Sequence, residues 1–156
     1  MSKILVAYFS AEGTTAAKAK KLCEAADAEL YEIKPEKPYS SSDINWRNPV
    51  SRCNREWLKK QRPELSDKNA PVADSDVVFL CFPIWYYNAP LIIRSFLEAY
   101  DFSGKKIVLF ATSGGSEFGK TAETLKQSAP NSEICEGDML NGSVSDEFLK
   151  EIAEKY

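Results

Sequence analysis

The most informative absence in this sequence is that of histidine, since its 156 residues include no histidine at all. Without an imidazole the chain cannot form a histidine-based catalytic triad or a histidine-ligated zinc site. Its four cysteines, Cys23, Cys53, Cys81 and Cys135, are widely separated, whereas zinc sites use clustered ligands. We therefore expect no metal site and no catalytic side chain. The thiols, Cys81 above all, are interpreted as small core residues in a reducing compartment.

The sequence also has little net charge and no long apolar run. Lys and Arg number 20 against 23 Asp and Glu, which leaves a net charge of −3. Such a weak charge argues against nucleic acid and against a membrane surface as partners. The residues Met1-Ser2-Lys3 lead directly into an apolar segment, so we expect no cleavable signal and a cytoplasmic protein.

What the sequence does contain is an alternation of strand and helix patterns. Unbroken apolar runs are typical of strands buried on both faces, and weaker runs predict two further strands. The predicted strands are 3–9, 30–33, 77–82, 107–111 and 134–140. The predicted helices are 16–26, 51–61, 89–100, 117–128 and 145–156.

This alternation predicts one α/β domain, residues 1–156, with a three-layer, doubly wound, five-stranded parallel sheet. For the last helix, Ser145 is the expected N-cap. Its inward face is expected to carry Phe148, Leu149 and Ile152.

Ligands of such sheets bind beyond the carboxyl ends of the strands, and the loop after the first strand has the composition of a phosphate-binding turn. Ser10, Thr14 and Thr15 supply hydroxyls, and Gly13 permits close approach of the backbone. The amides at the start of the following helix supply positive potential. The alternative is simple helix capping by Thr14 or Thr15.

Two further loops also differ from ordinary connections. Residues 83–90 contain three consecutive aromatic residues, Trp85, Tyr86 and Tyr87, which would stack against a flat ring or else cover a sheet edge or a partner surface. Residues 112–116 have two glycines and short hydroxyls. They would hydrogen-bond the polar edge of a heterocycle, or they form a flexible glycine turn.

Taken together, the segments 4–15, 82–100 and 101–115 resemble the flavodoxin family, in particular its short-chain bacterial members. The resemblance implies non-covalently bound FMN and a flavodoxin-like strand order of 2-1-3-4-5. The residues that it assigns to FMN are Ser10, Ala11, Glu12, Gly13, Thr14 and Thr15 around the phosphate, Pro83, Ile84, Trp85, Tyr86, Tyr87 and Asn88 in one ring loop, and Thr112, Ser113, Gly114 and Gly115 in the other.

The resemblance implies an electron carrier that serves redox-partner proteins. One alternative is an NAD(P)H-dependent quinone or flavin reductase of the same fold. A second is a binding module that has lost FMN, suggested by Glu12, a carboxylate where the family usually has a hydroxyl residue. The basic stretch 47–62 is interpreted as a solvated helix face, with the phosphates of NADPH or an acidic partner as the alternative contact.

Overall fold

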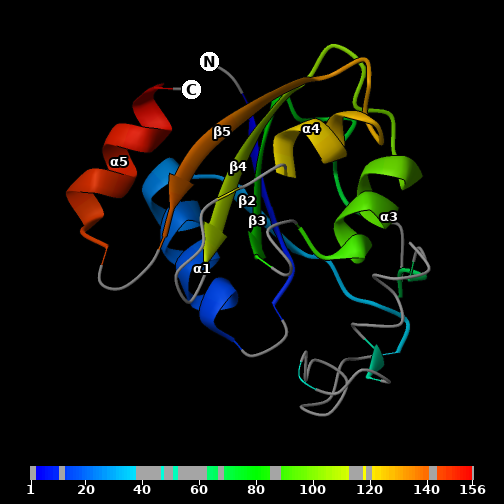
Figure 1. Ribbon diagram of the computed structural model, residues 1–156. Coiled ribbons are helices and arrows are strands. Elements are labelled where there is room, and N and C mark those ends of the chain that lie inside the picture. Colours follow the sequence, from blue (N-terminus) through cyan, green and yellow to red (C-terminus); the bar gives the residue numbers. More distant parts are fainter. Residues whose placement is uncertain are drawn as a thin grey trace.

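Five parallel strands form the centre of the structure, which is a computed structural model (Figure 1). The structure describes residues 3–10, 13–37, 47, 51–52, 63–66, 69–84, 89–112, 118, 121–140 and 144–155. The strands are β1 (Ile4–Tyr8), β2 (Glu29–Glu32), β3 (Val77–Pro83), β4 (Lys106–Thr112) and β5 (Glu133–Met139). Their order is β2-β1-β3-β4-β5, and all neighbours are parallel. The predicted sheet and strand order are confirmed.

Helices cover both faces of the sheet (Figure 1). On one face lie α1 (Thr14–Ala26) and α5 (Asp146–Lys155), and on the other lie α3 (Leu91–Ala99) and α4 (Thr121–Lys126). The helix predicted at 51–61 falls outside the described residues except for Ser51 and Arg52. No helix of the described ranges is long and apolar enough to cross a membrane.

The core consists of two apolar layers, one on each side of the sheet. Along β1, Leu5 and Ala7 pack in the layer that contains α3, whereas Val6 and Tyr8 pack in the layer that contains α1 and α5. This two-sided burial is why the central strands have unbroken apolar sequences. Cys81 is 1% exposed in the second layer, as predicted for a core thiol.

The start of α5 follows the prediction in part. Ser145 is confirmed as a cap, because its Oγ accepts a hydrogen bond from the Phe148 N–H at 3.2 Å. Leu149 and Ile152 are buried, but the inward placement of Phe148 is wrong, since Phe148 is 38% exposed. Around the helix, Phe148 lies about 100° from Leu149 but only about 40° from Ile152, so it stands at the edge of the buried face, where its ring stays partly exposed.

A β-bulge interrupts the pairing of β4 and β5 before these strands end. Leu109 pairs with Glu136 and Ala111 with Met139, so two residues of β5 lie opposite the single residue Phe110. A bulge of this kind bends the strand that carries the extra residue. The bend occurs close to the carboxyl ends of the two strands.

Candidate functional site

The turn between β1 and α1 is organised around Gly13. This residue is the N-cap of α1 with φ 94° and ψ −15°, a left-handed conformation that glycine adopts without steric cost. Its N–H donates to Ser10 Oγ at 2.9 Å, and its carbonyl accepts from the Ala17 N–H at 3.1 Å. The alternative of capping by Thr14 or Thr15 is therefore wrong, because Gly13 occupies the N-cap position.

Thr15 makes a contact with a distant part of the chain instead. Its Oγ1 lies 2.8 Å from Oγ1 of Thr112, the last residue of β4, and both side chains are buried. The carbonyl of Thr112 in turn accepts a hydrogen bond from the Ile84 N–H at 2.9 Å. Thr112 thus connects the start of α1 with the end of β3.

The structure therefore brings together the described members of all three predicted loops. The strands β1, β3 and β4 are neighbours in the sheet, and their carboxyl ends lie at one end of the molecule, where α1 begins (Figure 1). Ser10 and Gly13 belong to the first loop, Pro83 and Ile84 to the second, and Thr112 to the third. Outside the described residues lie Ala11, Glu12, Trp85, Tyr86, Tyr87, Asn88, Ser113, Gly114 and Gly115, together with the side chain of Thr14, and their roles stay predictions.

The chemistry of the described donors at α1 suits an anion. The first turn of α1 contains no acidic residue, and its sequence, Thr14-Thr15-Ala16-Ala17, carries no charge. The positive potential at this position therefore comes from the helix amides, which bind phosphate groups in many proteins. Hydroxyl groups nearby add neutral donors.

The neighbouring end of β2 contains an acidic group that is held by a phenol. Tyr8 OH donates to Glu32 Oε1 at 3.4 Å, and Lys34 Nζ lies 3.9 Å from the same oxygen. Burial, together with the charge and the hydrogen bond of Glu32, raises the pKa of Tyr8. Tyr8 is therefore neutral at physiological pH.

A metal does not fit the residues that the structure describes. Among them, no group of three or more His, Cys, Asp or Glu side chains is placed to hold an ion.

Comparison with known proteins places this arrangement in a family. The family model described as flavodoxin matches residues 3–156. A provisionally assigned flavoprotein from Bacteroides eggerthii is 42% identical, with a TM-score of 0.92 over 99% of this chain and 98% of that one. A second, from Bacteroides uniformis, is also 42% identical, with a TM-score of 0.90 over 98% of both chains.

One more distant structure contains a ligand. A flavoprotein from Lactobacillus acidophilus, solved in complex with FMN, has a TM-score of 0.73 and covers 89% of this chain and 93% of its own. At 19% identity it shares the fold with this chain. No curated protein matches the sequence.

Proposed function

The chain belongs to the flavodoxin family, and from this premise we propose that it binds FMN without a covalent bond and carries electrons between redox-partner proteins. The observation that carries the proposal is the start of α1. There Gly13 holds a left-handed turn, and the helix amides follow with no charged side chain in the first turn. A helix start of this kind binds a phosphate group.

The described donors suit the phosphate end of FMN, and the two loops proposed for the ring follow the ends of β3 and β4. The amides of α1 and the hydroxyls of Ser10 and Thr15 would hold the phosphate, and the ends of β3 and β4 would support the two loops proposed for the ring. In those loops, Trp85 and Tyr86 would stack on the ring and the backbone at 113–115 would bind its polar edge. Bound FMN would supply the redox chemistry that amino-acid side chains lack.

The partners would be a reductase and an acceptor protein in the cytoplasm. A net charge of −3 provides little long-range attraction, so we expect their association to depend weakly on salt.

Binding and reduction of FMN test this proposal in one series of measurements. The purified protein is stripped of flavin and titrated with FMN and with riboflavin, which lacks the phosphate, and binding is followed by flavin fluorescence. Because the α1 amides would contact the phosphate, we expect FMN to bind at least about tenfold more tightly than riboflavin. The FMN complex is then treated anaerobically with NADPH, first alone and then with a flavodoxin reductase.

Each outcome separates the proposed function from its alternatives. A yellow protein that bleaches when the reductase is added supports the electron carrier. Bleaching by NADPH alone contradicts it and identifies a self-sufficient reductase. A protein that retains no FMN contradicts both the electron carrier and the reductase, and the binding module that has lost FMN is then the remaining alternative.

A further inference from the structure

The contact between Thr15 and Thr112 joins two segments that are far apart in the sequence. Their Oγ1 atoms lie 2.8 Å apart across 97 residues, and the side chains are 2% and 7% exposed. Among the described residues each hydroxyl has the other as its partner. The pair is therefore a buried link between α1 and β4.

The alternation of side chains along β4 shows which face Thr112 occupies. Val108 and Phe110 belong to the apolar layer of α1 and α5, whereas Leu109 and Ala111 belong to the opposite layer. Because alternate residues of a strand share a face, Thr112 points to the α1 side, as its bond to Thr15 also requires. Its hydroxyl lies beneath the first turn of α1.

Hydroxyl chemistry fixes the direction of the bond once an anion is present. A threonine hydroxyl has one proton to donate and two lone pairs that accept. If Thr15 donates its proton to an anion at the helix start, the proton between the two threonines comes from Thr112. Thr112 would then donate to Thr15 Oγ1 and leave the Thr15 proton to point outward.

We propose that Thr112 is a positioning residue for the phosphate, acting through Thr15 and touching neither the phosphate nor the ring. This inference rests on the proposed function, because the phosphate is that of FMN. It changes the assignment of Thr112, which the family resemblance places in a ring loop. The Thr112 carbonyl keeps a separate role, since it accepts from the Ile84 N–H at 2.9 Å and holds the end of β3.

The two roles of Thr112 can be separated by substitution of its hydroxyl alone. Thr112→Val keeps the shape of the side chain and the carbonyl bond to Ile84 but removes the donor to Thr15. Thr112→Ser restores the donor. Ser132→Ala is the control for loss of a buried hydroxyl, because Ser132 Oγ donates to the Ala129 carbonyl at 2.7 Å before the amino end of β5.

The experiment measures the affinities of the apoproteins for FMN, riboflavin and inorganic phosphate. For Thr112→Val we expect FMN to bind about tenfold more weakly, because Thr15 Oγ1 loses the donor that holds its own proton toward the phosphate, and riboflavin to bind as in the wild type. Thr112→Ser and Ser132→Ala should keep wild-type affinity for both. The split between FMN and riboflavin distinguishes a phosphate role from a general loss of structure.

Other outcomes overturn the inference. Equal losses of FMN and riboflavin affinity in Thr112→Val would mean that the hydroxyl supports the ring loop or the fold and not the phosphate. Unchanged affinities for both ligands would mean that the hydroxyl has no role in binding. If the wild type binds no FMN, the proposed function fails, and the phosphate titration, read from amide chemical shifts, decides the inference separately. Phosphate binding that weakens in Thr112→Val supports it, and lack of phosphate binding overturns it.

Discussion

Gly137 in β5 lies so close to Leu109 in β4 that a Cβ atom on it would stand 2.6 Å from the Leu109 carbonyl oxygen. The same added Cβ atom would lie 2.8 Å from the ring of Phe110. This contact occurs at the β-bulge, where β5 provides the extra residue opposite Phe110. The bulge therefore needs a residue without a side chain at position 137, because the obstructing atoms include backbone.

We predict that Gly137→Ala destabilises the protein by about 1–3 kcal/mol, the usual cost of forcing an extra methyl group into a packed site. Urea unfolding of the apoprotein measures this loss. Glu136→Ala, at the adjacent exposed position of β5, is the matched control and should change stability by less than about 0.5 kcal/mol. An unchanged unfolding midpoint for Gly137→Ala would show that the two strands separate easily at the bulge.

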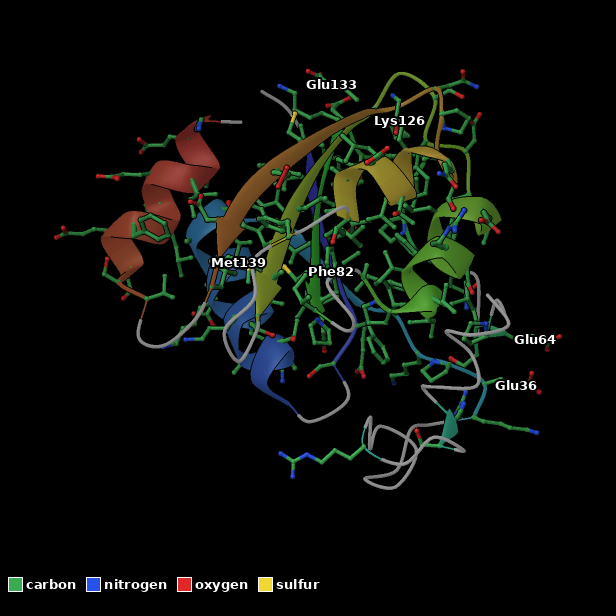
Figure 2. All side chains as sticks on the ribbon, viewed as in Figure 1. Glu36, Glu64, Phe82, Lys126, Glu133 and Met139 are labelled. Atoms are coloured by element: carbon green, nitrogen blue, oxygen red, sulfur yellow. The ribbon has the colours of Figure 1, made fainter. Side chains whose placement is uncertain are left out.

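A second prediction concerns two carboxyl groups that lie together at the edge of the molecule (Figure 2). Glu36 and Glu64 flank the antiparallel bridge of Pro35 and Leu65, and the Glu36 N–H donates to the Glu64 carbonyl at 2.7 Å. The hydrogen bond between the side chains and the charge of Glu64 raise the pKa of Glu36 above its ordinary value of 4.5, against the opposing charge of Lys37.

A carboxyl group whose pKa is raised by folding stabilises the folded state when protonated, and this stabilisation is lost as the pH rises through the raised pKa. We therefore expect Glu64→Gln to be more stable than the wild type at pH 7, with the difference shrinking as the pH falls toward 4.5. Unfolding curves across this range measure it, and Glu151→Gln on α5 is the control. Parallel pH profiles for wild type and Glu64→Gln would refute the interaction.

The third prediction concerns the reactivity of Cys81. Its side chain is 1% exposed, and burial, with a smaller effect of Cys23, raises the pKa of its thiol. Labelling must therefore await global unfolding, so iodoacetamide at pH 8 should modify Cys81 at least about a thousandfold more slowly than the half-buried Cys135. Mass spectrometry of the labelled peptides measures both rates. Comparable rates in the native protein would mean that β3 opens locally.

The sequence predicts the fold well where burial alone determines the pattern. The strands β3 and β4 are buried on both faces and stand out as unbroken apolar runs. The edge strand β5 has a weaker strand pattern in the sequence, because the exposed residues Glu133 and Glu136 interrupt its apolar residues. The inward placement of Phe148 was wrong because an aromatic residue at the edge of an apolar helix face has the same sequence pattern as a member of that face. How much of its ring is exposed depends on how the helix is rotated against the sheet.

The site was predictable to the level of loops but not of contacts. Parallel strands bring their carboxyl ends together, which locates the three loops. Residue statistics favour threonine over glycine as an N-cap, yet Gly13 takes this position because the turn requires a left-handed residue. The bond between Thr15 and Thr112 depends on the packing of α1 against β4, which no local pattern encodes.

The last prediction follows from Glu12, which precedes the left-handed Gly13 in the sequence. A carboxylate beside a bound phosphate weakens binding by like-charge repulsion. We expect Glu12→Thr to bind FMN about three- to tenfold more tightly than the wild type and riboflavin with unchanged affinity, because riboflavin carries no charge at this position. Glu24→Thr, the same change farther along α1, should leave FMN affinity unchanged. The gain should diminish at 1 M salt, where the screening length falls to about 3 Å, and a gain that persists there would have to come from a new hydrogen bond rather than from removal of the charge.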